Sequence, residues 1–468
     1  MNSANINIVW IRNDLRIKDN PALFNASKSG RVLPVFIWAP HEEDKLPGAA
    51  SKVWLYYALK SFEKDLEDIG LKLTYGIGDS LDMLSQLAKK TKATGLYWNH
   101  RYEPKVYERD QFIKSKFSSL LEVKCFNGNY FTSPNNIRNK SDRPFKVFTP
   151  FWKKCLSVIG DNDVVPTLRK PLGVIGDTKL NDLEELELLE NSEWEKKIAG
   201  EWKISEQSAN QILNNYIEKA HGNYENNRNI PSLKGTSSLS PYLKFGQVSP
   251  NRILALLRKR NPQSWKSSQF IAEIGWREFA SHLLFHYPQT INNPLRDEFQ
   301  NFPWQINAGA YKKWGKGLTG YPFVDAGMRQ LWQTGWMHNR VRMVVASFLV
   351  KHLLIDWRKG AEWFWDTLFD ADLASNTLGW QWVAGCGADA APYFRVFNPI
   401  LQSKKFDPNG LYIKKWIKEL THINDSAIHL PDSSQDLFNS VLSYPEPIVS
   451  HGESRIRALT AYQSIKRA

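Results

Sequence analysis

The stretch that decides the fold is LPVFIW, residues Leu33–Trp38. It is a short apolar run of β-branched and aromatic residues, which is typical of a buried strand. Four further runs of this kind lie within the first 130 residues: NIVW at Asn7–Trp10, LKLTY at Leu71–Tyr75, GLYW at Gly95–Trp98 and LEVKCF at Leu121–Phe126. Helical patterns separate them, and the clearest covers Ser51–Ile69. Strands that alternate with helices predict a parallel α/β sheet.

The chain changes character after this region. Residues 131–205 hold Pro, Asn and Gly residues and then an acidic segment, which predicts an interdomain linker with short helices. From residue 206 onward the periodicity is helical almost throughout, which predicts a larger all-α domain. The expected domains are therefore 1–130, 131–205 and 206–468. The fingerprints GxGxxG and Walker A are both absent, so we do not expect the α/β domain to bind a dinucleotide in the usual dehydrogenase manner.

Charge and aromatic content favour a polyanionic partner without proving one. Lys plus Arg is 61 and Asp plus Glu is 48, which gives +13. The segment 177–201 carries nine acids and three lysines, or −6, so the other residues carry +19. Such a surface suits nucleic acid, or a protein that is merely basic. Twelve of the 19 tryptophans lie between Trp265 and Trp416, a density that suits stacking on bases or flavins, or a bulky helical core.

The sequence also predicts where the protein works. No apolar run approaches the ~18–20 residues that a membrane span needs, and the first ten residues do not resemble a secretory signal. The three cysteines cannot form a disulfide framework, and their spacing is not that of a zinc site. We therefore expect a cytoplasmic protein without a membrane partner or a bound metal.

Three polar clusters in the helical region are candidates for chemistry. Residues 235–241 (GTSSLSP) precede a helical pattern, and the hydroxyl groups suit a phosphate site or an ordinary helix cap. In the helical pattern around residue 275, Glu273, Trp276 and Arg277 share one face. They could line a polar pocket, or form an intrahelical ion pair beside a core tryptophan.

The third cluster comprises two polar segments further along the chain. We interpret residues 336–343 (WMHNRVRM) as helical, which puts Asn339 and Met343 on one face. An amide can make paired hydrogen bonds to a base edge, and methionine adapts to flat ligands. Asp370, Asp372 and Asn376 lie in an otherwise apolar stretch, where buried polar groups need partners.

These segments together resemble DNA photolyases and cryptochromes, most closely the microbial photolyases for cyclobutane pyrimidine dimers. The strongest motifs are TGYP at Thr319–Pro322, GWMHNR at Gly335–Arg340 and GWQW at Gly379–Trp382. The likeness runs from Ile8 to beyond Pro399, nearly the whole chain. It implies a parallel, Rossmann-like sheet of the photolyase type, followed by a larger all-α domain that binds FAD.

The resemblance also implies the roles of individual residues. FAD-binding positions are Tyr224, Thr236, Ser237, Ser238, Leu239, Ser240, Arg342, Asp370, Ala371, Asp372 and Asn376. The lesion pocket and catalytic residues are Glu273, Trp276, Asn339, Met343 and Trp382. DNA contacts come from Arg228, Glu273, Trp276, Arg277, Asn339, Arg340 and Arg395. An electron relay runs through Trp380, Trp357 and Trp304.

The implied enzyme is a deoxyribodipyrimidine photo-lyase that repairs cyclobutane pyrimidine dimers by light-driven electron transfer from reduced FAD to the flipped-out lesion. The alternative is a cryptochrome-type photoreceptor without repair. Some photolyases bind a methenyltetrahydrofolate antenna through an Asn-Glu pair; here the matching pair is Tyr107-Glu108, so we expect a second chromophore with Glu108 as its one matching contact. We expect a monomer that acts on DNA containing pyrimidine dimers and associates with the nucleoid through it.

Overall fold

The computed structural model describes residues 5–160, 168, 171–174, 176, 178–219, 221–390, 394–431 and 444–467. The chain forms two compact units. The first comprises residues 1–219, 237–288 and 372–374, and the second comprises residues 220–236, 289–371 and 375–468. The chain enters each unit more than once, and the expected domain limits at 130 and 205 stay predictions.

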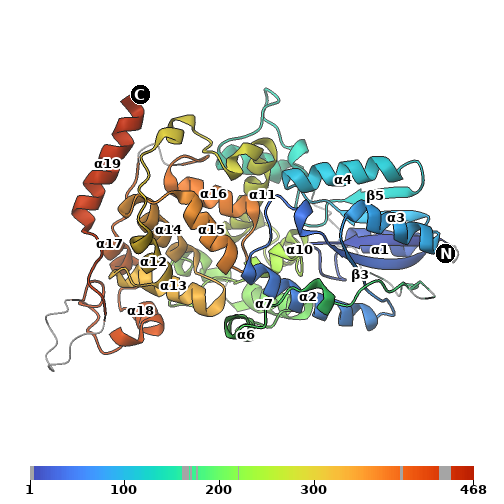
Figure 1. The fold of residues 1–468 in the computed structure, drawn as a ribbon, viewed down its shortest axis with the longest axis horizontal. Coiled ribbons are helices and arrows are strands. Elements are labelled where there is room, and N and C mark those ends of the chain that lie inside the picture. The colour runs from blue at the N-terminus through green and yellow to red at the C-terminus, as the bar shows by residue number, and fades with distance from the viewer. Residues whose placement is uncertain are drawn as a thin grey trace. The chain divides into compact units, whose positions relative to one another are not determined.

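The first unit contains the predicted parallel sheet, with the strand order β3-β2-β1-β4-β5. Its edge strands β3 and β5 are labelled in Figure 1. Its strands are β1 (Ile6–Ile11), β2 (Arg31–Trp38), β3 (Thr74–Ile77), β4 (Gly95–Asn99) and β5 (Glu122–Phe126). The central strand β1 is buried on both faces, which explains its continuous apolar run. Pro34 is tolerated within β2 because pairing with β3 starts only at Val35. The fold class predicted from the apolar runs is confirmed.

One strand begins later than its apolar run. The sequence predicts a strand over Leu71–Tyr75, but β3 starts at Thr74. Leu71 and Leu73 are buried all the same, 2% and 3% exposed. Both residues lie in the segment before the strand, where their side chains are buried. Burial of the side chains, and not hydrogen bonding between strands, therefore explains this part of the apolar run.

Helices alternate with these strands. They are α1 (Pro21–Ser29), α2 (Ala49–Glu67), α3 (Ser80–Thr91) and α4 (Pro104–Phe117). The helix predicted over Ser51–Ile69 is α2, and Trp54, Leu59 and Phe62 form part of its buried face. Local signals fix two of the helix starts, because the side chains of Asn20 and Asp79 cap α1 and α3.

The first unit also contains helices from the predicted linker and from the helical region. They are α5 (Phe148–Val158), α6 (Glu193–Gly200), α7 (Glu206–Lys219), α9 (Ser240–Lys244), α10 (Pro250–Arg260) and α11 (Gln269–His286). The short helices expected in residues 131–205 are therefore present as α5 and α6. A full capping box at Ser192 and Glu195 starts α6 within the acidic segment.

The second unit is helical. Its helices are α8 (Tyr224–Asn227), α12 (Ala308–Lys316), α13 (Pro322–Thr334), α14 (Asn339–Ser347), α15 (Trp357–Thr367), α16 (Leu373–Ala384), α17 (Pro399–Phe406), α18 (Leu411–Trp416) and α19 (His451–Arg467). One apolar core runs through this unit and includes Trp314, Trp357 and Trp380. Much of the tryptophan content is therefore core. In the described part of the chain, no helix has both the length and the apolarity for crossing a membrane.

Candidate functional site

The clearest polar feature of the second unit is the pair Arg342–Asp370. Arg342 lies on α14, and Asp370 lies between α15 and α16. Arg342 Nη2 donates to Asp370 Oδ2 at 2.8 Å, while its Nε donates to the Met337 carbonyl at 2.7 Å. The two bonds hold the guanidinium in one orientation, and the carboxylate side chain is only 4% exposed. The sequence predicted that Arg342 would give Asp370 its partner, and the structure contains this contact.

Asp370 has a second oxygen that suits a ligand. In the described residues, Oδ1 is buried and has no hydrogen-bond partner. Buried acceptors rarely stay unpaired, so this atom fits a donor supplied by a bound molecule. The ribose hydroxyl groups of FAD are donors of this kind. Asn376 on α16 is equally suitable, because its Nδ2 donates to the Ala361 carbonyl at 3.0 Å, which leaves its Oδ1 as an acceptor. These residues fit the predicted cofactor.

The hydroxyl-rich segment forms a turn rather than a helix cap. The short helix α9 follows it and is preceded by Leu239, which makes no side-chain capping bond. Ser237 Oγ instead accepts from the Leu239 amide at 3.4 Å, and Ser238 takes a left-handed conformation with φ of 54°. The interpretation of this cluster as an ordinary cap is therefore wrong. Ser237 and Ser238 thus lie in a turn ahead of α9, a position where hydroxyl groups suit phosphate oxygens.

Just before this turn, in the second unit, the backbone at Gly235 packs closely against the backbone at Asn227. A Cβ at Gly235 would lie 2.5 Å from the Asn227 carbonyl oxygen, so only glycine fits there. Tyr224 begins α8 in the same segment and is half-buried, and the Arg228 guanidinium lies 5.6 Å from the centre of its ring. Close packing thus fixes the path of the segment that carries Tyr224 and Arg228.

Helix α11 carries the three first-unit residues predicted to contact the lesion or the DNA. Trp276 stacks on Phe148 of α5, with ring centroids 4.0 Å apart and planes at 9°. Glu273, on the same helix, is half-buried and accepts from Gln269 Nε2 at 2.8 Å. Sequence reasoning missed Phe148, which lies 128 positions away and carries no local signal. Stacked rings of this kind contribute about 0.5–1.5 kcal/mol beyond their buried area, so Trp276 is held in place.

Arg277 is engaged within its own unit. Its Nη1 donates to the Asn129 carbonyl at 2.7 Å, and its guanidinium lies 4.5 Å from the centre of the Tyr130 ring. Burial would lower the pKa of Arg277, but Tyr130, Asp372, Glu278 and Glu103 raise it above its ordinary value. This cation therefore stabilises the unit, and its predicted contact with DNA stays a prediction.

Glu278 is a buried acid that the sequence pattern did not single out. It follows Arg277, and its Oε1 lies 3.8 Å from Arg277 Nη1, while Oε2 accepts from the amides of Phe131 and Thr132 at 3.0 and 3.4 Å. Burial raises its pKa to about 7, although Arg277 opposes the shift. The only sequence signal was an acid inside an apolar helix.

The lesion-pocket residues of the second unit lie at the start of α14 and on α16. Asn339 is exposed, whereas Met343 and Trp382 are half-buried. The helix predicted to start at Trp336 starts at Asn339 instead, because His338 caps it: the Arg340 amide donates to His338 Nδ1 at 3.2 Å. Burial lowers the pKa of His338 to about 4, aided by Arg342 and Arg340, so the ring is neutral and can accept this bond.

The predicted DNA-contacting arginines of this unit differ in exposure. Arg340 donates twice to Asn229 Oδ1, from Nε at 3.1 Å and from Nη2 at 2.7 Å, and it lies over the Phe406 ring. Arg395 is exposed and lies 5.3 Å from the centre of the Phe397 ring. Both guanidinium groups lie over aromatic rings, and their fork of donors is of the kind that suits a phosphate.

The three relay tryptophans differ in exposure. Trp380 and Trp357 are each 2% exposed, and Trp304 is half-buried. Trp380 packs against Gly360 of α15, the helix that Trp357 begins. Trp304 lies 4.3 Å from Phe302, centroid to centroid. The order Trp380, Trp357, Trp304 and the relay function stay predictions.

A second line of rings also leads away from Trp380. Centroid distances are 6.4 Å from Trp380 to Trp314, 6.2 Å from Trp314 to Trp363 and 6.3 Å from Trp363 to Trp332. Trp332 is 49% exposed. This line ends at the surface on α13, so the predicted relay is not the only series of aromatic rings between Trp380 and solvent.

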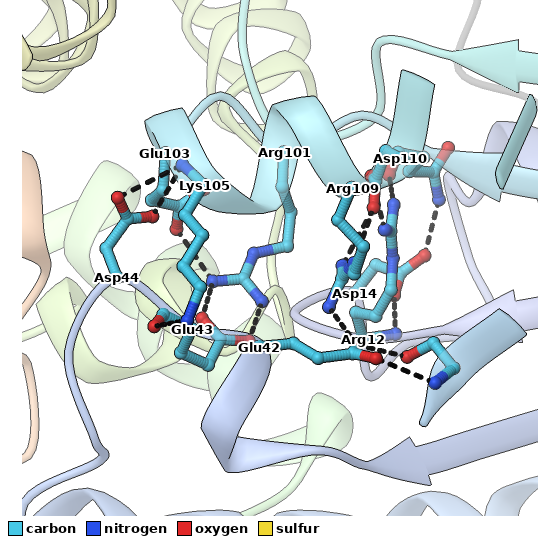
Figure 2. Close-up of polar contacts among 12 residues, drawn as sticks. Arg12, Asp14, Glu42, Glu43, Asp44, Arg101, Glu103, Lys105, Arg109 and Asp110 are labelled. Carbon is cyan, nitrogen blue, oxygen red and sulfur yellow. Dashed lines mark hydrogen bonds and ion pairs between the residues drawn. The ribbon is translucent and has the colours of Figure 1, made fainter. Parts of the chain in front are cut away.

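The sheet of the first unit presents a charged network where strands β1 and β4 end, the position at which ligands bind in many open α/β sheets. Figure 2 shows that these charges pair with one another. Arg12 Nη1 contacts Asp110 Oδ2 at 2.6 Å, and Arg109 bridges Asp110 and Glu42. Arg12 and Arg109 also both lie over the Trp10 ring. These ion pairs neutralise one another, whereas Asn99 Oδ1, His100 Nδ1, Arg101 Nε and Glu103 Oε2 are buried without a hydrogen-bond partner among the described residues.

Two neighbouring features bear on the antenna. Arg101 binds Glu43 and Glu103, and although burial would raise the pKa of Glu103, the Arg101 guanidinium lowers it below its usual value (Figure 2). Glu108 lies outside this network: it is exposed on α4. Its neighbour Tyr107 packs on Tyr102 and Phe285 with centroid distances of 6.0 and 5.1 Å. The predicted antenna contact is therefore accessible beside an aromatic cluster.

Comparison with known proteins accounts for both parts of the chain. Residues 7–170 match the family model of DNA photolyase, and residues 270–464 match the FAD-binding domain of DNA photolyase. A deoxyribodipyrimidine photo-lyase of Agrobacterium fabrum is 42% identical over 98% of both chains. Cryptochrome-1 of Arabidopsis thaliana is 36% identical over 97% of this chain and 70% of that protein.

A solved structure agrees with these matches. A bacterial class III photolyase from Agrobacterium tumefaciens superposes with a TM-score of 0.93 at 40% identity, covering 100% of this chain and 99% of that one. The predicted enzyme class, a photo-lyase, and the predicted FAD cofactor are confirmed. The chain belongs to the DNA photolyase family, which includes the cryptochromes.

Proposed function

We propose that this protein repairs cyclobutane pyrimidine dimers in DNA, using light and reduced FAD. The observation that carries the proposal is the face of α11, where Trp276 is stacked on Phe148 and the half-buried carboxyl group of Glu273 lies one helical turn away. A rigid aromatic surface beside an acid suits a lesion that presents ring faces and carbonyl groups. The 42% identity to a deoxyribodipyrimidine photo-lyase supports the same function.

The aromatic residues select the lesion. A pyrimidine dimer inside a duplex cannot reach a buried cofactor, and photolyases extrude it from the base stack. Damage weakens stacking and lowers the cost of extrusion. Trp276 and Trp382 offer flat apolar surfaces that replace the lost stacking partners, and each exposed base face that packs on such a ring gains about 1–3 kcal/mol.

Polar residues orient the lesion and stabilise its charge. Glu273 can hydrogen-bond a pyrimidine carbonyl when it carries a proton, and the amide of Asn339 can donate to or accept from a base edge. Such groups act most strongly where negative charge develops on the lesion. Met343 fills the remaining apolar space without fixing one shape.

The cofactor supplies the electron. When bound and reduced, FAD would supply a light-driven one-electron donor for cleavage of the two carbon–carbon bonds that join the pyrimidines, with the electron returned afterwards. Arg342, Asp370 and Asn376 would hold it. Trp380, Trp357 and Trp304 serve a separate task, which is to bring electrons from outside to an oxidised cofactor.

A second chromophore belongs to the proposal. Glu108 offers an exposed carboxylate beside the cluster of Tyr107, Tyr102 and Phe285, which suits the flat, polar ring system of methenyltetrahydrofolate. The protein would act as a monomer on cytoplasmic DNA. Purified protein that contains folate, and whose action spectrum loses the folate band in Glu108→Ala, would support the antenna; size-exclusion chromatography tests the monomer.

The decisive experiment is repair of a defined lesion. Reduced protein is mixed with an oligonucleotide that contains one cyclobutane thymine dimer, illuminated with blue or near-ultraviolet light, and assayed for restored thymines. We expect repair in light and none in the dark. Glu273→Gln should lower the quantum yield while leaving binding to undamaged DNA unchanged, and Glu298→Gln, at an exposed position, should match the wild type.

The same experiment addresses the photoreceptor alternative. The 36% identity to Cryptochrome-1 of Arabidopsis thaliana is the observation in its favour. A photoreceptor would photoreduce its FAD and still leave the dimer intact. No repair by fully reduced, FAD-loaded protein would therefore reject the proposed function and favour a signalling role.

A further inference from the structure

A small cavity in the second unit lies beside Trp382 and has no role in the mechanism above. It holds about 50 Å³, several times the ~10–15 Å³ that one water needs. Three of its lining residues are cations, Arg296, Lys351 and Arg395. Among the described residues, no carboxylate forms an ion pair with any of the three. A cavity with three cations and no counter-charge attracts an anion.

Lys351 is the unusual member of this set. It is 1% exposed and lies in a single π-helical turn, Phe348–His352, which continues α14. Such turns are rare and occur mostly at functional sites. In the described structure its Nζ makes one hydrogen bond, to the Ala384 carbonyl at 3.0 Å, and lies 2.9 Å from the centre of the Phe394 ring. An ammonium group has three donors, so two remain for a ligand.

Ser347 supplies an independent sign of a ligand. Its hydroxyl is buried, lines the same cavity and has no hydrogen-bond partner in the described residues. Ser347 and Lys351 are four positions apart, and both continue the face of α14 that carries Met343. A hydroxyl donor next to an ammonium group and two guanidinium groups is the donor set that phosphate oxygens accept best.

We propose that this cavity binds a phosphate group through Lys351, Ser347 and the flanking arginines Arg296 and Arg395. If the proposed DNA repair is correct, that phosphate belongs to the strand that carries the flipped lesion, because Trp382 lines the same cavity. The site would then bind the backbone phosphate in the position it takes when the dimer is extruded. A free phosphate ion shares this chemistry, and the experiment separates the two sources.

The electrostatics of Lys351 give the site a pH dependence. Burial holds the pKa of Lys351 well below its ordinary value. Cys386 packs beside it, but burial raises the pKa of that thiol to about 12, so it offers no negative charge. Arg296 and Arg395, which line the same cavity, are cations. A bound phosphate favours the protonated form of Lys351, so affinity should fall as pH rises through the lowered pKa.

A purely structural role is the alternative to exclude. Ala384 ends α16, and a lysine that binds the last carbonyl of a helix stabilises it. Lys351→Met keeps the length and volume of the side chain and suits the apolar surroundings, so we expect it to fold. Lys404→Met is the matched control, because it removes the same charge from an exposed position on α17.

The test measures phosphate and DNA binding by FAD-loaded protein in the dark. Inorganic phosphate is titrated by phosphorus NMR, and single-stranded oligonucleotides with and without a dimer by fluorescence anisotropy, between pH 6 and 9. We expect Lys351→Met to weaken binding roughly tenfold or more, as the loss of a charged hydrogen bond does, and to reduce any pH dependence of oligonucleotide binding, because phosphodiesters, unlike inorganic phosphate, do not titrate between pH 6 and 9. Ser347→Ala should weaken it less, and Lys404→Met only slightly.

The two arms identify the source. Weaker binding by Lys351→Met of both inorganic phosphate and oligonucleotides assigns the site to the DNA backbone. Weaker binding of inorganic phosphate alone assigns it to a free ion, and either result supports the site. Equal binding by the Lys351 and Lys404 variants in both arms would overturn it. Repair at saturating DNA is measured separately, so a failed site and a failed repair activity are distinguishable.

Discussion

Gly360 of α15 permits the close packing of Trp380, and replacing it with alanine is a sharp test of that packing. A Cβ at this position would collide with Cη2 and Cζ3 of Trp380 and would lie 2.7 Å from Leu349 Cδ2. These neighbours are the body of a buried ring and a buried leucine, so neither can move away at low cost. Trp380 is also the first residue of the predicted relay.

Two opposing effects set the size of the change. Alanine in place of glycine inside a helix stabilises by about 0.5–1 kcal/mol. Overfilling a well-packed core costs about 1–3 kcal/mol. We therefore expect Gly360→Ala to lower the free energy of unfolding by roughly 1 kcal/mol, with an upper limit of about 2.5 kcal/mol.

Gly379 of α16 provides the control. It is exposed, and a Cβ added there would meet nothing within 4 Å, so Gly379→Ala should gain the helical contribution alone, about 0.5–1 kcal/mol. Both variants are compared by urea unfolding followed through tryptophan fluorescence. The difference between them isolates the packing cost. If Gly360→Ala proves as stable as Gly379→Ala, the tight contact between α15 and Trp380 is not real.

Three further predictions test the site. Arg342→Ala should leave the buried Asp370 carboxylate without its partner, which should lower the free energy of unfolding in urea by about 3–5 kcal/mol. The variant should also lose most of its bound FAD, measured by absorbance. Adding Asp370→Asn should recover much of the stability. Trp304→Phe should slow FAD photoreduction under blue light, and adding Trp332→Phe should stop it. A wild-type rate in the double variant would show that neither series of rings carries electrons to FAD. The raised pKa of Glu278, about 7, means that its contribution to stability is present below about pH 4.5 and lost as pH rises through 7. Thermal unfolding of Glu278→Gln should therefore lack this pH dependence, and equal pH profiles would contradict the burial of the acid.

The sheet could be predicted because burial leaves a direct trace in sequence. Strands covered on both faces read as continuous apolar runs, and LPVFIW is one of them. Leu71 and Leu73 show the limit of this signal, since they are buried in the segment before a strand and produce the same pattern. Periodicity reports burial, and the hydrogen bonds that define the strand ends follow from neighbours elsewhere in the chain.

Local spacing predicted part of the site, and long-range contacts supplied the rest. Glu273 and Trp276 were placed on one face by helical spacing alone. The ring that fixes Trp276, Phe148, is 128 positions away on another helix, so no pattern could point to it. Lys351 looks like an ordinary lysine in sequence and becomes notable only through its burial. The serine-rich turn was ambiguous for a similar reason, since a cap and a turn use the same residues.

Affinity and selectivity for damaged DNA should come from different parts of this molecule. Under the proposed function, cations such as Arg395 would meet phosphates, which every sequence displays, so they would contribute binding that falls steeply with salt but carries no information about damage. The rings of Trp276 and Trp382 would meet bases only after extrusion, so their energy would be gained by the lesion and barely by intact DNA. Lys351 would combine the two behaviours, since it binds a phosphate but only in the extruded state. Its cavity is also lined by Trp382, so a phosphate would reach it only when the backbone lies close to that ring. Its loss should therefore lower the affinity for damaged DNA more than that for intact DNA, a pattern that an exposed cation cannot produce.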